Sequence, residues 1–161
     1  MAEESRSRQV IKFAERLPSL PDLSFRIGNY RKVYGKAKYF YKKEWKGNEK
    51  KSPAFGKIVR ATSHGWNHLV GKTITTNYKD AIKRLNHLPN AKQIIERSEV
   101  IYETTKEVDK RGLIINRHCL MGKLENGQIL KVVVKEIGEK LIFNTVYSSG
   151  EIKKMAKKHE L

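Results

Sequence analysis

Two histidines, His64 and His68, lie four residues apart in the segment His64-Gly65-Trp66-Asn67-His68. On a helix, this spacing brings both imidazoles to one face. Imidazole titrates near neutral pH, so it can accept or donate a proton during catalysis. Zinc proteases use the same spacing, but they need a glutamate after the first histidine, where this chain has Gly65. The pair therefore favours acid–base chemistry, and a zinc site completed by His118 or Cys119 remains as a weaker alternative.

A second group of candidates, His118, Lys131 and Lys135, lies on two predicted strands joined at Asn126-Gly127. Asn-Gly is typical of a two-residue type I′ hairpin. That turn pairs His118 with Lys135 and places all three cationic groups on one face of the sheet, where they could bind an anion. The opposite face would be the core, made of Ile115, Cys119, Met121, Leu130, Val132 and Val134. The plainer alternative is a solvated face that carries lysines.

Thr145 and Tyr147 alternate onto one face of the next predicted strand. A three-residue loop over 138–140 would put them on the face of Lys131, whereas a two-residue loop would turn Thr145 into the core. RNA can be cleaved without metal or cofactor when its 2′-hydroxyl attacks the adjacent phosphate, provided that a base, an acid and cations are supplied. The predicted catalytic set is His64, His68, His118, Lys131, Thr145 and Tyr147.

The charge of the chain favours a polyanionic partner. Its 161 residues include 34 Lys and Arg against 17 Asp and Glu, a formal net charge of +17. Nucleic acid is the first expectation, and an anionic membrane surface or an acidic protein are the others. The residues expected to contact RNA outside the catalytic set are Arg60, Trp66, Lys72, Arg117, Lys135 and Ser148.

The segment from Arg26 to Arg60 is the most basic part of the chain, with twelve Lys or Arg residues against Glu44 and Glu49. Aromatic residues between these cations could stack on the bases of single-stranded nucleic acid. The plainer alternative is a basic, partly disordered arm whose aromatics pack on the core. We expect residues 1–55 to form an N-terminal helix followed by this arm, and residues 56–161 to form the nuclease domain.

The chain has one cysteine, no apolar secretory signal and no run of about 20 apolar residues. These features predict a cytoplasmic protein without a membrane span. Hydrophobic spacing predicts helices that end near Gly71 and near Leu88, with Tyr78 on the buried stripe of the second. A helix over 90–96, an edge strand over 100–102 and a short C-terminal helix after Ser148 are also expected. His87 and His159 are placed on helix surfaces and left out of the site.

Together these elements predict an α+β fold, in which N-terminal helices pack on one face of a three- to four-stranded antiparallel sheet. Their order and residues, from His64-Gly-Trp-Asn-His68 through Lys131-Val-Val-Val to Thr145-Val-Tyr147-Ser148, resemble the phage and toxin branches of one ribonuclease superfamily. That superfamily unites barnase, EndoU, colicin nucleases and RelE, and the resemblance covers about residues 57–150.

The resemblance implies a small metal-independent ribonuclease with its active site on the open face of the sheet. It implies a histidine role for His64 or His68, a cationic role for Lys131 and a hydroxyl role for Thr145, with Tyr147 or Ser148 adjacent. No carboxylate base is evident in the sequence, so a histidine would act as the base.

The predicted function is that of an endoribonuclease toxin domain that cleaves RNA, with tRNA as the expected substrate, by 2′-hydroxyl transesterification. An acidic antitoxin or immunity protein would be its partner. The alternatives are a non-catalytic RNA- or DNA-binding module and a zinc-dependent nuclease.

Overall fold

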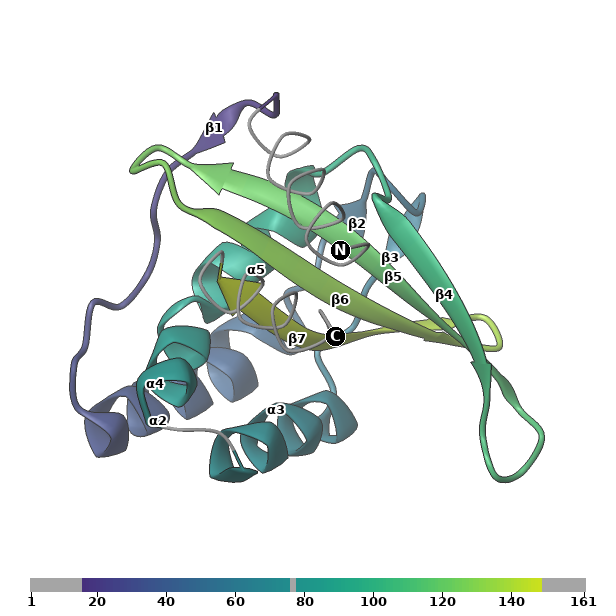
Figure 1. Cartoon of the computed structure of the whole chain (residues 1–161), viewed down its shortest axis with the longest axis horizontal. Helices are drawn as coiled ribbons and strands as arrows, with labels where there is room; N and C mark the ends of the chain where they lie inside the picture. Colours follow the sequence, from purple (N-terminus) through teal and green to yellow (C-terminus); the bar gives the residue numbers. More distant parts are fainter. Residues whose placement is uncertain (1–15, 76–77, 149–161) are drawn as a thin grey trace, which may run out of the picture.

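The computed structural model describes residues 16–75 and 78–148, apart from the side chains of residues 72–75. In this part of the chain, α-helices and a curled mixed sheet form an α+β fold (Figure 1). The α-helices are α2 (Tyr30–Tyr39), α3 (Ser63–Thr75), α4 (Tyr78–Asn86) and α5 (Leu88–Arg97). The helices expected before Leu17 and after Ser148 fall almost entirely outside the described residues.

The sheet is built on an antiparallel meander of four strands. These are β4 (Glu103–Val108), β5 (Ile114–Leu124), β6 (Ile129–Ile137) and β7 (Lys140–Ser148). Two further pairings are parallel: β1 (Ser19–Leu20) with β5, and a bridge between Arg60 and Ile142 of β7. The expectation of a purely antiparallel sheet is therefore wrong. The expected edge strand over 100–102 is also displaced, because pairing with β5 begins at Glu103.

The turn between β5 and β6 contains three residues instead of the predicted two. The backbone N–H of Leu124 donates to the carbonyl of Gln128 at 2.8 Å, and Gly127 has a φ of 88°. A type I turn followed by a residue in the left-handed region has this form, and glycine adopts it without strain. The predicted register is wrong by one residue, since His118 lies opposite Val134 and Lys131 lies opposite Met121.

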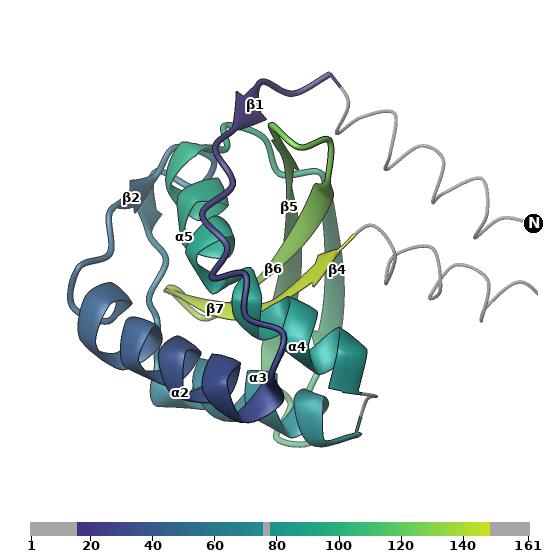
Figure 2. The same cartoon turned by 90° about the vertical axis from the view of Figure 1, so that its left-hand side faces the viewer.

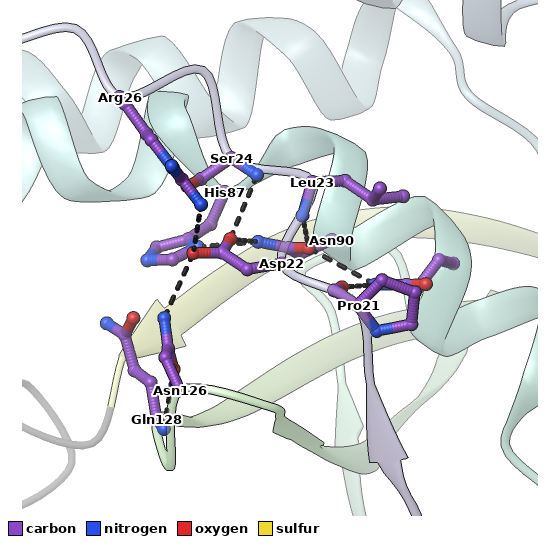
Figure 3. Close-up of polar contacts among 10 residues, drawn as sticks. Pro21, Asp22, Leu23, Ser24, Arg26, His87, Asn90, Asn126 and Gln128 are labelled. Atoms are coloured by element: carbon purple, nitrogen blue, oxygen red, sulfur yellow. Dashed lines mark hydrogen bonds and ion pairs between the residues drawn. The ribbon is translucent and has the colours of Figure 1, made fainter.

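A polar network around Asp22 holds this turn and the N-terminal segment together (Figure 3). Asn126 Nδ2 donates to one carboxylate oxygen of Asp22 at 2.9 Å, and Asn90 Nδ2 donates to the other at 3.0 Å. Asn90 Oδ1 also accepts the backbone N–H of Leu23 at 2.8 Å. His87, expected on a helix surface, is buried with its Nδ1 3.0 Å from Asn90 Nδ2. The turn length therefore follows from contacts with residues far away in the sequence.

The β6–β7 connection decides where Thr145 points. Ile137 pairs with Lys140, so the loop contains two residues, the case predicted to turn Thr145 into the core. The register then shifts between Val133 and Val134, so that Val133 lies opposite Thr145. A β-bulge adds one residue to one strand and reverses the side-chain alternation beyond it. Thr145 consequently shares the face of Lys131 despite the short loop.

We name the two faces of β5 and β6 by their residues. The core face bears Leu120, Val132 and Val134, and it packs against α5 (Figure 2). The second face bears Cys119, Lys131 and Val133. The predicted core face is thus divided, because its residues from β5 and from β6 lie on different sides of the sheet.

The basic, aromatic-rich segment before residue 55 contributes to the same core. Asn29 caps α2 by accepting the backbone N–H of Lys32 at 3.0 Å. Val33 and Ala37 of α2 are buried, and a π-helical turn over Phe40–Trp45 buries Tyr41 and Trp45. The ring centroids of Trp45 and Phe143 are 4.7 Å apart. In the described residues, no helix has the length and apolar character required to span a membrane.

Candidate nucleic-acid interface

A basic cleft of about 870 Å³ opens between three elements: the β2–β3 hairpin, the start of α3 and the β6–β7 turn. The hairpin pairs Lys51–Ser52 with Lys57–Ile58. The positively charged and imidazole side chains that line the cleft are Lys51, Lys57, Arg60, His64 and Lys140. Glu139 is the acidic residue in the lining. A hollow with this excess of cations attracts anions such as phosphate groups.

The backbone around the cleft is held by hydrogen bonds that fix the start of α3 against β7. Arg60 pairs with β7 through its N–H to the Leu141 carbonyl at 2.9 Å and through its carbonyl to the Phe143 N–H at 3.0 Å. Thr62 caps α3, because its Oγ1 accepts the backbone N–H of Gly65 at 3.1 Å. The Tyr41 hydroxyl donates to the Thr62 carbonyl at 2.8 Å. The start of α3 is therefore held in place, and it carries the exposed side chain of His64.

Gly65 allows α3 to approach β7 closely. A Cβ at this position would collide with the carbonyl oxygen of Phe143 and would lie 2.9 Å from the Tyr41 hydroxyl. His68 follows nearly one helical turn later, so it lies on the flank of α3 that faces β7. Its Nε2 is shielded from solvent, whereas His64 is exposed. The helix extends to Thr75, past the predicted end at Gly71.

His118 is separated from the other predicted catalytic residues because it lies on the core face. Its Nε2 is 3.0 Å from Glu136 Oε1 and its Nδ1 is 2.8 Å from Thr104 Oγ1. The Phe55 ring packs edge-on against the imidazole at a centroid distance of 5.2 Å. The prediction that His118, Lys131 and Lys135 share one face is wrong, and the physical reason is the one-residue change in register.

Lys131, Tyr147 and Thr145 lie together on the second face, because the β-bulge offsets the effect of the two-residue loop. Lys131 lies directly opposite Tyr147, and Thr145 lies two residues before Tyr147 on the same strand. Thr145 is only 1% exposed, and its Oγ1 has no hydrogen-bond partner among the described residues. Lys131 stays half-buried, and the pKa of the Cys119 thiol is raised mainly by burial, against the opposing effect of the Lys131 charge.

Two charged residues that are not among the predicted site residues also lie at the second face. The Arg84 guanidinium of α4 lies 4.9 Å from the centroid of the Tyr147 ring, a cation–π contact. Glu103 lies directly opposite Cys119 and so brings a carboxylate to the second face. If the expected strand over 100–102 had been continued past Tyr102, the strand period of two would have placed Glu103, Thr105 and Glu107 on one face.

Arg117 and Lys135, two of the predicted RNA contacts, are both partly buried. Arg117 forms an ion pair with Glu107 at 2.7 Å, so its charge is already compensated. Lys135 lies half-buried on the second face, opposite Arg117 and Ile142. Because Ile142 lines the cleft, Lys135 connects the cleft with the second face.

The other predicted RNA contacts differ in their exposure. Arg60 is exposed and lines the cleft. Trp66 is 4% exposed, with its ring packed against Tyr34 and Tyr41, and Ser148 is also 4% exposed. The Lys72 side chain lies outside the described residues. Burial therefore removes Trp66 and Ser148 from the accessible surface.

Among the residues that the structure describes, no group of three or more His, Cys, Asp and Glu side chains could hold a metal ion. The structure brings Arg60 and His64 together in the cleft and Lys131, Thr145 and Tyr147 together on the second face, and it places His118 elsewhere. Comparisons of the chain with protein-family models, with curated proteins and with solved structures find no match.

Proposed function

We propose that this protein binds RNA in the basic cleft and cleaves it by a metal-independent reaction of the RNA's own 2′-hydroxyl. The observation that carries the proposal is the exposed His64 imidazole in a cleft with Lys51, Lys57, Arg60 and Lys140. Cations bind the phosphates on either side of the scissile bond, and an imidazole can move the proton that transesterification requires.

Binding relies first on the phosphate backbone. Each phosphate that a lysine or arginine neutralises releases condensed counterions, so the affinity falls as salt concentration rises. The cleft supplies four such cations, and the formal net charge of +17 adds a long-range attraction. Lys135 and Lys131 extend the positive surface from the cleft wall along the second face.

In the cleavage step, His64 takes the proton from the 2′-hydroxyl, and the 2′-oxygen forms a bond to phosphorus. The bond from phosphorus to the 5′-oxygen then breaks, and that oxygen takes a proton from a lysine ammonium of the cleft or from water. The products are a 2′,3′-cyclic phosphate and a 5′-hydroxyl. Arg60 and Lys140 stabilise the additional negative charge on the phosphorane.

Membership of the barnase, EndoU, colicin and RelE superfamily is part of this proposal. Its support is the four-stranded meander after several helices, together with the shared face of Lys131 and Thr145. Within that proposal, His64 remains the base, and Glu103 would add a carboxylate to the face that bears Lys131. Thr145 and Tyr147 are too buried to be primary substrate contacts, so they would instead position Lys131 and Arg84.

The toxin role and the partner are proposed on charge. An acidic antitoxin or immunity protein would bind across the cleft, because its carboxylates would be complementary to the same cations that bind phosphate. Such a partner would compete with RNA. Addition of the acidic polymer poly-glutamate should therefore weaken RNA binding by the wild-type protein, and it should have less effect on a Lys140→Ala variant.

The test is incubation with total tRNA, with and without EDTA, followed by sequencing of the RNA ends. Wild-type protein should produce 5′-hydroxyl ends in both conditions, and His64→Ala should produce at least about 100-fold fewer, the usual scale of an acid–base residue. Asn67→Ala, another exposed position of α3 outside the cleft lining, is the matched control and should cleave normally. Full activity of His64→Ala would remove His64 from the mechanism, and loss of activity in EDTA would instead favour a zinc-dependent nuclease.

A non-catalytic RNA- or DNA-binding module is the second candidate. It is favoured by the burial of Thr145 and of His68 Nε2, which leaves one accessible imidazole in the cleft. This candidate predicts salt-dependent binding with no cleavage products even at excess protein. The same tRNA incubation therefore separates the two.

A further inference from the structure

Tyr78 is exposed to an unusual degree for the first residue of an amphipathic helix. The spacing of apolar residues predicts it on the buried stripe of α4, but 69% of its surface is accessible. Its ring meets the ring of Tyr30 edge to face, at a centroid distance of 5.1 Å and an interplanar angle of 70°. The exposed ring of Tyr78 and the partly buried ring of Tyr30 thus form an aromatic pair that reaches the surface.

The pair forms one wall of an open groove of about 730 Å³ between the start of α2 and the start of α4. The residues that line it are Gly28, Asn29, Tyr30, Arg31, Tyr34, Tyr78 and Ile82. Tyr34 lies 6.0 Å from Tyr30 and 5.7 Å from the buried Trp66, measured between ring centroids. The aromatic wall is therefore anchored in the core, which preorganises it for a planar ligand.

The chemistry of the groove suits nucleobases. Rings that meet edge to face leave aromatic faces free for stacking, and every base has a flat π surface. Arg31, exposed at the groove, can pair with a phosphate or stack on a base. A Cβ added at Gly28 would meet no atom within 4 Å, so this side of the groove is open.

We propose that this groove binds unpaired bases of single-stranded RNA, as a second contact for the RNA held in the basic cleft. This inference rests on the proposed function and specifies its substrate as single-stranded. Charge complementarity supports RNA as the occupant, because Arg31 lines the groove and α2, which has no acidic residue in its first turn, carries the exposed lysines Lys32, Lys36 and Lys38.

The groove includes the start of α4, and the cleft includes the start of the helix that precedes it in the chain, α3 (Figure 1). The 13 residues of that helix span about 20 Å at 1.5 Å per residue. A strand of several nucleotides could therefore contact both regions, with its phosphates in the cleft and its unpaired bases in the groove.

The test compares a fluorescently labelled single-stranded RNA with a duplex of the same sequence, by anisotropy, using the full-length protein. Tyr78→Ala should weaken binding of the single strand at least about fivefold, the lower end of what one stacked base contributes. Its affinity for the duplex should not change, because paired bases cannot enter the groove. Tyr78→Phe keeps the ring and should bind as wild type, and so should Tyr39→Ala, which removes a 57% exposed tyrosine of α2 outside the groove.

The outcomes separate this inference from the proposed function. If Tyr78→Ala binds the single strand as tightly as wild type while Lys140→Ala binds it weakly, the groove is not a base site and the cleft proposal stands. If Tyr78→Ala weakens single strand and duplex equally, stacking is not the cause and the inference fails. If the wild-type protein binds neither RNA, both proposals fail.

Discussion

His118 Nε2 and Glu136 Oε1 lie 3.0 Å apart on the core face, and they join the middle of β5 to the end of β6. The carboxylate can only accept, which assigns the ring proton to Nε2 and leaves Nδ1 to accept from the Thr104 hydroxyl. The pair therefore connects three strands and contributes to the stability of the sheet, and neither of its residues lines the cleft.

The first prediction concerns the pH dependence of this pair. The pKa of Glu136 is lowered, first by the hydrogen bond from His118 and against the opposing effect of burial. A glutamate whose pKa is lower in the folded state stabilises the fold at pH values above its unfolded pKa, which is about 4.3. This contribution is lost as the pH falls through the lower pKa of the folded state. Glu136→Gln should therefore unfold about 1 kcal/mol more easily at pH 7, the scale of one partly exposed hydrogen bond, and the difference should shrink toward pH 2.

Urea denaturation of both proteins across this pH range measures the effect. His118→Gln is the companion variant, which should be less stable at pH 7 yet still bind RNA, because its side chain does not line the cleft. Equal stability of wild type and Glu136→Gln at pH 7 would show that the hydrogen bond between His118 and Glu136 contributes nothing.

The second prediction concerns salt. Lys140 is an exposed cation of the cleft. Lys140→Ala should weaken RNA binding and reduce the slope of log affinity against log salt by about 1, as expected for one lost phosphate contact. Lys110→Ala removes the same charge from the exposed turn between β4 and β5 and should leave the slope unchanged. Anisotropy titrations at several salt concentrations measure both, and an identical slope for the two variants would place the RNA elsewhere.

The third prediction concerns the packing of α3. Gly65→Ala should destabilise the protein by about 2 kcal/mol, because its Cβ would collide with the Phe143 carbonyl, which belongs to the backbone and cannot rotate away. Gly71→Ala is the matched control on the same helix. A Cβ there meets nothing within 4 Å, so better helix propensity should stabilise the protein by about 0.5–1 kcal/mol. Thermal unfolding of both variants should show melting temperatures that move in opposite directions.

The fourth prediction concerns the Asp22 network. Asn90 is fully buried, and its side chain accepts the Leu23 N–H and donates to Asp22. Asn90→Ala should cost about 1–3 kcal/mol, because it leaves a backbone donor without its acceptor. Asn126→Ala removes a contact from the same carboxylate at an exposed position and should cost less. Guanidinium denaturation ranks the two, and the reverse order would show that Asn126 has the dominant role in the turn.

Asp22 also contributes a pH effect to this network. Burial opposes its ionisation, but the Ser24 N–H and the Asn90 amide outweigh burial, and the pKa of the carboxyl is lowered. Like Glu136, Asp22 should stabilise the fold above about pH 4 and lose that contribution in acid. Asp22→Asn should therefore flatten the acid branch of the stability curve.

The sequence by itself determined the features that depend only on residues close together along the chain. Runs of β-branched and aliphatic residues on either side of Asn126-Gly127 define the β5–β6 hairpin, and Thr62, a residue type that commonly caps helices, caps α3. The net charge of +17 is independent of folding. Such signals are local, because they depend on backbone preferences and side-chain types over a few residues.

The tertiary structure decided which residues meet. Asn-Gly fits both a two-residue and a three-residue turn, and contacts of the turn with Leu20 and Asp22 accompany the longer one. Because strand side chains alternate with a period of two, that single extra residue moved His118 to the opposite face from Lys131. The bulge at Val133 had the reverse effect on β7 and returned Thr145 to the face of Lys131. Register depends on packing between distant segments, and for that reason the pattern of residues along the chain could not fix the composition of the site.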